Sequence, residues 1–501
     1  MTLQEIFKSL EKSKYEIDTE SRLARVGLKD EQKIAPILKK YDWLYDLSTV
    51  NFVKENYKKE TKPNIKEQLR LLFFELADFF LYKKVAEIDD RLSTFFNKTE
   101  VELDGEKISF YNLGPLISKT ADFGKRERLY EAGLRVIKKA NSDYLLMLES
   151  ALKSTKSDLN FDGYIDFYQN KKTIDYNLFQ NLVFKINSQL QGLYREKMNK
   201  FVEKNLNCLW KNLKSCHLSY LLVLNRFDQY FPKEKLMPVF EASMKDLGFN
   251  IKNQPNIQID TEERPKKNPR AVCYPAKVPQ EIHLIIKPIG GFYDFTAFFH
   301  EAGHSEHHAH VKASLPFAFR HLESSNALAE LFSFLFESLT RNPLWLEKYL
   351  DLTKKTANQI TYDSEMANFY LLIRYLAKFC YEYQLFSSGD FSVGPQLYAK
   401  TLTKFTNFIY DPIAYLDDLD DGFYSADYLR AWIGHSQLVA FFEKKFGGNW
   451  FEKKEAGEWL KKIWELGSQF ELEEVLEKSH IGKAFDIKPL VLRFKKSLAK
   501  K

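Results

Sequence analysis

The stretch His300-Glu301-Ala302-Gly303-His304 lies within a segment, Phe292 to Val311, that has no proline and repeats apolar residues at helical spacing. Residues four apart lie on one face of a helix, so the two imidazoles can hold one metal ion, which for this pattern is zinc. Glu301 lies between them and can reach a water molecule bound to that metal. The stretch therefore predicts a helix that carries two metal ligands and a general base.

A short β-rich run precedes this helix. It extends from Glu281 to Lys287, and Pro288, Gly290 and Gly291 interrupt the chain before the helix begins. We therefore expect a small β-sheet next to the metal helix. The strand could also pair with the backbone of an extended peptide by strand addition, which holds a peptide with little regard to its sequence.

A catalytic zinc site needs a third protein ligand and one open position, so a second element should fold back against the first. A second helical pattern begins with cap-type residues near Ser324 to Asn326 and stops before Pro343. Two glutamates compete for the third position, Glu330 inside this helix and Glu323 just before it. Gly303 has no side chain, which would allow another backbone or a substrate to approach closely.

A polar stripe runs along the second helical segment. Glu330 shares one helical face with Ser333 and Glu337 in otherwise very apolar surroundings. Burying two carboxylates there is costly unless a metal ion or hydrogen bonds compensate. We therefore expect Glu330 to be the ligand. Glu337 would orient a ligand or make a structural salt bridge, and Glu323 would be a charge favoured by the helix dipole.

The remaining histidines are expected to lie outside the metal site. His307, His308 and His310 predict a solvated polar face of the helix. His283 and His321 are not needed, because two histidines and one glutamate already complete a site with one open position.

Together these residues resemble the thimet oligopeptidase and oligoendopeptidase F group of zinc metallopeptidases. The signature of that group is His-Glu-x-x-His followed by a glutamate ligand on a second helix, and its oligoendopeptidase branch has Glu-x-x-Ser-x-x-x-Glu, matched by Glu330, Ser333 and Glu337. A third block, Tyr424 to Trp432, is similar to the tyrosine-rich segment of the group, so that the resemblance covers roughly residues 270 to 435. One departure is the stretch Asp417 to Asp421, where the group usually carries a histidine.

The resemblance implies two mostly helical lobes around a deep channel that admits short peptides and excludes folded proteins. The Zn²⁺ ligands would be His300, His304 and Glu330. Glu301 would act as general base, and the hydroxyl of Tyr424 or Tyr428 would stabilise the oxyanion. In a chain with 27 tyrosines, core packing is the alternative role for both tyrosines.

Two other functions are considered. A carboxypeptidase similar to the helical Taq carboxypeptidase would have the same zinc helices and would bind the free C-terminus of its substrate with an arginine such as Arg430, for which a scaffold ion pair is the alternative. A catalytically silent helical binding protein would keep the metal only as a structural element. The intact Glu301 argues against it, because a structural zinc needs no general base.

Length and composition predict a large, mainly α-helical protein. The chain has 501 residues, of which 45% are hydrophobic and 15% aromatic, enough for one or two substantial cores. Strand-like segments are short and scarce, whereas long proline-free runs with helical spacing occur at Ile65 to Lys84, Arg126 to Lys156 and Tyr176 to Lys204. We expect an N-terminal helical region at residues 1–190 and a catalytic region at residues 191–501.

Charge and targeting signals limit the classes of partner and the cellular location that we expect. A net charge of only +6 gives no strong electrostatic case for binding nucleic acid or membranes, and the lysines of Arg493 to Lys501 are expected to form a solvated tail. Neither a signal-peptide core at Met1 to Glu20 nor a stretch of about 18 uncharged apolar residues occurs, so we expect a cytoplasmic protein. The four cysteines lack zinc-knuckle or redox spacing, which fits reduced thiols in that compartment.

Overall fold

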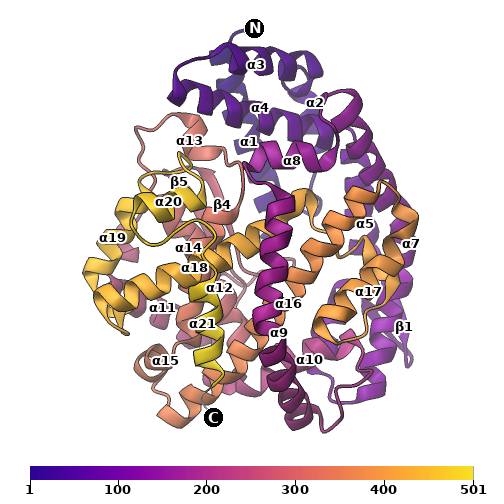
Figure 1. The fold of residues 1–501 in the computed structure, drawn as a ribbon, viewed down its shortest axis with the longest axis vertical. Coiled ribbons are helices and arrows are strands. Elements are labelled where there is room, and N and C mark those ends of the chain that lie inside the picture. Colours follow the sequence, from indigo (N-terminus) through magenta and orange to yellow (C-terminus); the bar gives the residue numbers. More distant parts are fainter. Residues whose placement is uncertain (500–501) are drawn as a thin grey trace.

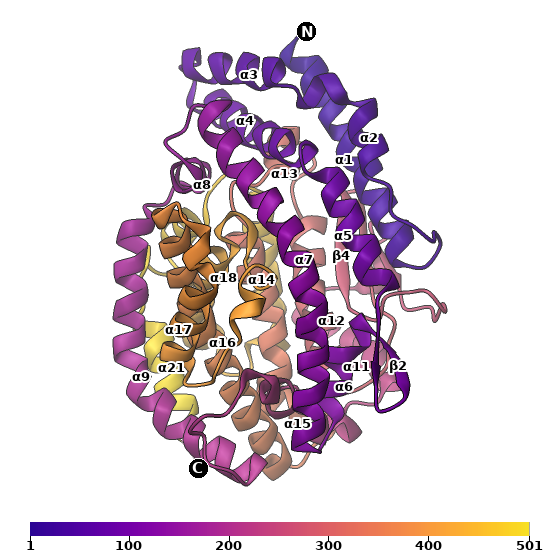
Figure 2. The same ribbon diagram turned by 90° about the vertical axis from the view of Figure 1, so that its right-hand side faces the viewer.

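The long amphipathic runs of the sequence form long helices in the structure. A computed structural model describes residues 1–499, and within them 71% of the chain is helical and 5% is in strands, so the predicted mainly α fold is confirmed. The three predicted long helices are α4 (Pro63–Lys83), α7 (Phe123–Ser157) and α9 (Tyr176–Leu206). Figure 2 shows α7 running down most of the molecule beside α6 (Phe110–Lys119), which it contacts.

The first helices pack around a core of their own. They are α1 (Leu3–Arg25), α2 (Ala35–Lys40), α3 (Leu47–Lys59) and α4, joined by Ala86 of α5 (Ala86–Lys98) and Phe167 of α8 (Tyr164–Lys172). Helices α5, α6 and α7 form smaller apolar clusters beside this core. In Figure 1, α1 to α4 lie at the N-terminal end of the molecule. Their apolar core also takes in Ala318, Phe319 and Leu322, from α13 (Phe317–His321) and the residue after it. The N-terminal helices therefore pack directly on the part of the chain that follows the metal helix.

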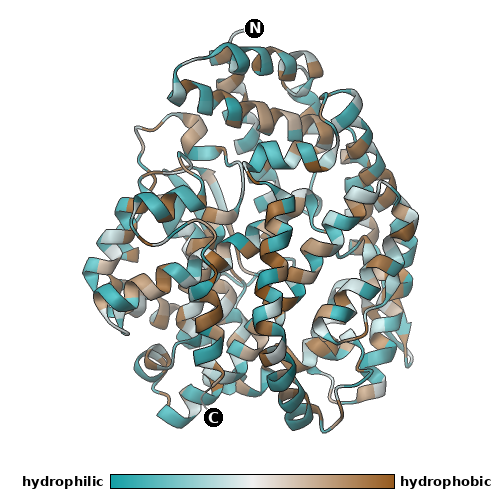
Figure 3. Cartoon of the chain, viewed as in Figure 1, coloured by the Kyte–Doolittle hydropathy of each residue, from teal (hydrophilic) through white to brown (hydrophobic). Residues whose placement is uncertain are grey.

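The later helices share a larger core that extends from Leu134 to Leu498. They are α9, α10 (Leu218–Leu222), α11 (Lys233–Leu247), α12 (Phe292–Ala309), α14 (Ala327–Glu337), α15 (Pro343–Leu350), α16 (Lys354–Ser388), α17 (Gly394–Thr406), α18 (Tyr424–Phe446), α19 (Lys454–Trp464), α20 (Leu472–Lys478) and α21 (Lys488–Ser497). Figure 3 shows hydrophilic and hydrophobic residues alternating along most of these helices, as expected for helices with one buried face. The predicted boundary near residue 190 falls inside α9, which continues to Leu206.

A three-stranded sheet lies against α12, as predicted. Its strands are β3 (Ile257–Asp260), β4 (Val272–Lys277) and β5 (Glu281–Ile285), in the order β3-β5-β4. The predicted strand, β5, is the central one, because it pairs in parallel with β3 and antiparallel with β4. Since both of its edges are occupied, the prediction that this strand binds a peptide by strand addition is wrong. A separate hairpin joins β1 (Glu100–Leu103) and β2 (Glu106–Ser109).

The C-terminal lysines that the structure describes, Lys495 and Lys496, are exposed as predicted, but they lie on a packed helix rather than on a tail. Residues 488–497 form α21, which buries Leu490, Val491 and Phe494 against the large core. The predicted tail also includes Lys500 and Lys501, which lie outside the described residues. A search of residues 1–499 finds no helix with the length and apolar character needed to cross a membrane.

Candidate metal centre

The two helices predicted to carry the metal ligands pack closely together. They are α12, which holds the His-Glu-x-x-His motif, and α14, which follows it after α13. Gly303 lies at the contact, where a Cβ atom would come within 2.6 Å of the Phe332 carbonyl oxygen and 2.7 Å of Ser333 Cα. The prediction that this glycine allows close approach of another backbone is confirmed, and that backbone is α14. Any larger residue would push the two helices apart.

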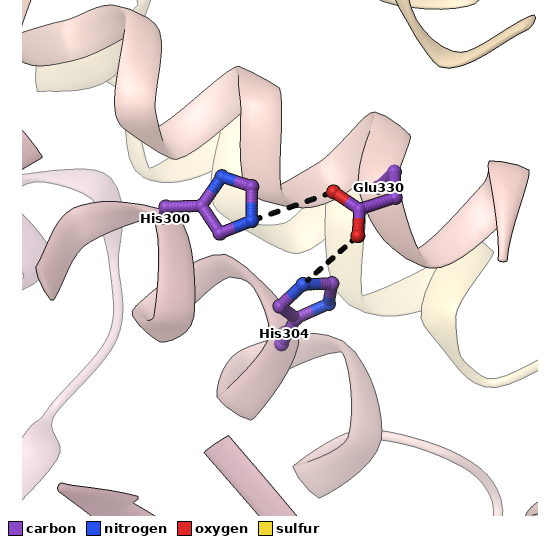
Figure 4. A group of neighbouring side chains, drawn as sticks. All are labelled: His300, His304 and Glu330. Carbon is purple, nitrogen blue, oxygen red and sulfur yellow. Dashed lines mark ion pairs between the residues drawn. The ribbon is translucent and has the colours of Figure 1, made fainter. Parts of the chain in front are cut away.

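His300, His304 and Glu330 come together at this contact (Figure 4). The carboxylate lies between the two rings, with Glu330 Oε2 3.4 Å from His300 Nε2 and Oε1 3.7 Å from His304 Nε2. One ligand atom from each of the three residues lies within 4.8 Å of the others. Glu330 is only 2% exposed, and its Oε2 has no hydrogen-bond partner among residues 1–499. Two imidazoles and a carboxylate suit zinc with one open position, so the residues present fit such an ion.

The charges of this group are coupled. Burial alone would raise the pKa of Glu330, but the two neighbouring histidines outweigh burial and lower it. Burial alone would lower the pKa of His300, and the carboxylates of Glu330 and Glu337 raise it well above its usual range. The pKa of His304 is lowered, chiefly by burial. The site therefore places a buried carboxylate between two half-buried rings, where a cation would balance its charge.

Glu337 holds the far side of the His300 ring. Its Oε2 lies 2.8 Å from His300 Nδ1, and its Oε1 accepts a hydrogen bond from Arg341 in the 3₁₀ turn Ser338–Arg341. Burial would raise the pKa of Glu337, but Arg341 and His300 lower it to about 2, so it is a carboxylate. An acceptor at Nδ1 directs the ring proton there and leaves Nε2 free for a metal. The predicted salt bridge of Glu337 is present, and its contact with His300 is the one that orienting a ligand would require.

Glu301 is held by the sheet. Its Oε2 accepts a hydrogen bond of 2.8 Å from the backbone N–H of Cys273 in β4. Cys273 contacts α12 a second time, because the Ser305 hydroxyl lies 3.3 Å from Cys273 Sγ. No periodicity or motif marks Cys273, so sequence reasoning missed this contact. It arises because β4, an outer strand, lies beside the metal helix.

The two tyrosines of the third sequence block have different surroundings. The Tyr424 hydroxyl donates a hydrogen bond of 2.5 Å to Glu330 Oε1. Tyr428 lies against aromatic rings instead, with its centroid 5.6 Å from that of Phe334 and 4.9 Å from that of Tyr375. Burial, followed by the charge of Glu330, raises the pKa of both hydroxyls far above the usual range, so both are proton donors. Tyr424 thus contacts the candidate centre directly, and Tyr428 packs next to it.

Several predicted residues lie outside the centre. Glu323 precedes α14 and is not part of the cluster, and burial raises its pKa to about 7. His307 is 3% exposed and packs on Phe332, so the prediction of a solvated face is wrong for this residue. A side chain whose Cα lies on the outer part of a helix is still buried when a neighbouring helix covers it. His283 contacts Glu281, and His321 accepts a hydrogen bond from the backbone of Val278.

Arg430 makes the scaffold ion pair that was predicted as one of its two roles. It is 2% exposed, and its guanidinium donates to Glu473 at 2.7 and 2.9 Å and to Glu471 at 3.1 Å. The acidic stretch that replaces the usual histidine of the resembled group is also held by cations. Arg374 and Lys378 both pair with Asp418.

A scan against models of known protein families finds no match for this chain, and a search of curated proteins finds no relative.

Proposed function

We propose that this chain is a zinc-dependent endopeptidase that hydrolyses short peptides. The observation that carries the proposal is the meeting of His300, His304 and Glu330 beside a glutamate, Glu301, whose side chain is fixed by β4. A metal held only for structure does not need a carboxylate kept free of the ligand set next to it. The resemblance to the oligopeptidases, stated for the sequence, supports the same function.

The residues of the site have separable tasks in this proposal. His300, His304 and Glu330 would hold zinc, which would supply Lewis acidity to a water molecule and to the peptide carbonyl. Glu301 accepts a proton from the attacking water and later passes it to the leaving amine. Tyr424 has a hydroxyl that remains protonated, and its single hydrogen would turn from Glu330 to the oxyanion of the tetrahedral intermediate. Tyr428 is the second candidate for that donor.

Peptide binding in this proposal involves β4 rather than β5. An outer strand can add one further strand at its free side, and β4 is the outer strand whose Cys273 N–H reaches Glu301. An extended peptide paired there would pass close to the general base. Folded proteins do not offer an extended backbone, so short unstructured peptides are the proposed substrates.

The decisive experiment compares Glu301→Gln with the unaltered protein, both loaded with zinc. The amide cannot accept a proton, so turnover of a mixed peptide library should fall by about 10²- to 10⁴-fold while zinc content is unchanged. Glu234→Gln, at an exposed position of α11, is the matched control and should keep full activity. Near-normal turnover of the zinc-replete Glu301→Gln protein would exclude this mechanism.

Product lengths separate this function from its nearest alternative. Mass spectrometry of the products should show internal cleavage of short peptides and no digestion of a stably folded protein. Release of single C-terminal residues alone would instead favour a carboxypeptidase, although Arg430 already has two carboxylate partners inside the protein. The absence of any cleavage by the zinc-loaded protein would favour the silent binding protein.

A further inference from the structure

A series of buried and half-buried charges begins at His300 and leads away from the candidate centre. His300 Nδ1 contacts Glu337 Oε2 at 2.8 Å, and Arg341 donates a hydrogen bond to the other oxygen of Glu337. Arg341 is 8% exposed, and its Nε lies 3.6 Å from Glu365 Oε1, on α16. The guanidinium of Arg341 therefore lies between two carboxylates.

The far end of this series is on the last helix of the protein. Arg493 of α21 donates a hydrogen bond of 2.8 Å to Glu365 Oε1, the same oxygen that faces Arg341. Its other terminal nitrogen donates at 2.9 Å to Nδ1 of His435. His435 lies on α18 and is 1% exposed. Burial, and then the charges of Arg493 and Arg341, lower the pKa of His435 well below its usual range, so its ring is a neutral acceptor. Helix α21 is thus joined to α16 and α18 by one guanidinium.

Opposite charges alternate in this series, so the position of each side chain depends on the next one. Two carboxylates, Glu337 and Glu365, alternate with two guanidiniums, Arg341 and Arg493. Removing one member of a buried ion pair leaves its partner as an uncompensated charge in surroundings of low polarity. Without Arg493, Glu365 would still face the guanidinium of Arg341. Arg341 would then be drawn toward Glu365 and away from Glu337, and the Glu337 carboxylate sets the position of the His300 ring.

We propose that Arg341, Glu365 and Arg493 are positioning residues of the metal centre, through which the C-terminal helix α21 fixes the orientation of His300. The inference rests on the proposed metal site but not on its peptidase activity. The carboxylate that contacts a metal-bound histidine usually contributes about 10- to 100-fold to metal affinity. In the proposal, metal affinity also depends on Arg493, which lies on α21 and acts through Glu365 and Arg341.

The test measures zinc affinity by competition with a chromophoric chelator, using zinc alone as the ligand. Arg493→Met should weaken zinc binding roughly tenfold, the lower end of the range for groups that hold a metal ligand in place. Arg493→Lys keeps the charge and should restore most of the affinity. Lys496→Met, at an exposed position of the same helix, is the matched control and should not change it. Equal affinities of the Arg493→Met and unaltered proteins would overturn the proposal.

A double-mutant cycle distinguishes positioning from general damage to the fold. In a Glu337→Ala background there is no carboxylate left to transmit the effect, so Arg493→Met should then change zinc affinity by less than about twofold. An undiminished effect in that background would show that Arg493 acts by another route. If Arg493→Met does not fold, Glu365→Gln replaces it in the same cycle, because it removes the central charge with almost no change in shape.

The outcomes also separate this inference from the proposed function. A zinc-binding protein with the predicted coupling but no peptidase activity would retain the inference and overturn the function. An active peptidase in which Arg493 and Glu337 contribute independently would do the reverse. A protein with no affinity for zinc would overturn both.

Discussion

The two ends of α14 are held by buried charges in different ways. At its N-terminal end, Asp427 Oδ2 accepts a hydrogen bond of 3.1 Å from the backbone N–H of Asn326 and pairs with Lys172 at 2.8 Å. At its C-terminal end, Glu337 contacts a ring nitrogen of His300 and the guanidinium of Arg341. Glu330 lies between the two ends.

The two groups of charges contact α14 through different kinds of atom. Asp427, paired with Lys172, accepts a hydrogen bond from a backbone amide, so this Asp427 cluster fixes where α14 begins. The Glu337 cluster terminates on a side-chain ring, so it fixes how a candidate ligand is turned. Removing the carboxylate of Asp427 and removing that of Glu337 should therefore have different consequences. The first should change chiefly the free energy of unfolding, and the second chiefly the affinity for metal.

The largest effect on metal is expected between the two ends. Glu330→Ala removes a candidate ligand, so zinc affinity should fall well beyond the roughly 10- to 100-fold typical of groups outside the ligand set. Zinc content and affinity of the purified variant measure this, with circular dichroism to verify folding. A folded Glu330→Ala protein that binds zinc normally would show that the third ligand lies elsewhere.

The N-terminal end should give the largest change in stability. Asp427 is 0% exposed and Lys172 is 4% exposed, so Asp427→Ala leaves an unpaired buried ammonium and should lower the free energy of unfolding by about 3 to 5 kcal/mol. Urea denaturation measures the loss. Glu443→Ala, at an exposed position of α18, the helix that carries Asp427, is the control and should stay within about 0.5 kcal/mol. Equal stability of the two variants would mean that the Asp427 cluster does not anchor α14.

At the C-terminal end of α14, a substitution should change metal affinity more than stability. Glu337→Ala should weaken zinc binding by about 10- to 100-fold, because the His300 ring loses the acceptor at Nδ1. Its cost in stability should be smaller than that of Asp427→Ala, since the Glu337 side chain is 18% exposed and Arg341 keeps Glu365 nearby. The two variants are compared by chelator competition and urea denaturation. A larger loss of stability than of metal affinity would remove the distinction between the two ends.

The smallest effect on metal is expected for Glu323, which precedes α14. Glu323→Gln should leave zinc affinity within about twofold, because this residue lies outside the cluster. Burial raises its pKa to about 7 from an ordinary value of 4.5, so the protonated form is favoured in the folded protein. Stability from this group is present below the ordinary pKa and is lost as the pH rises through about 7. Between about pH 5 and pH 8 the unaltered protein should therefore lose more stability than the Gln variant, as denaturation curves at both values would reveal.

Local spacing predicted much of the candidate site. Helical periodicity put His300, His304 and Glu301 on α12 and put Glu330 and Glu337 on one face of α14, and both helices occur close to the expected bounds. Sequence reasoning missed the contact of Cys273 with Glu301 and that of Asp427 with Asn326 at the start of α14. Cys273 belongs to no motif, and the position of Asp427 in the Tyr424 to Trp432 block does not reveal its partner. Their roles depend on contacts between residues far apart in the chain.

Other predictions were wrong or were left open for the same reason. The run from Glu281 was correctly expected to be a strand, but its place in the middle of the sheet was set by β3 and β4, which pair with it from both sides. The burial of His307 and the ion pairs of Arg430 likewise depend on which helix lies opposite. A sequence pattern gives the face on which a residue lies, and only packing gives what covers that face.

The sequence by itself determined which residues share a helical face, because the geometry of an α-helix fixes the spacing of side chains within one segment. It thus determined the pairing of His300 with His304, the place of Glu301 between them and the mainly α fold. Only the tertiary structure decided that Glu330 rather than Glu323 lies beside the histidines, that Tyr424 contacts Glu330, and that β4 holds Glu301. Such contacts join distant elements, and they follow from the packing of the whole core rather than from any local spacing.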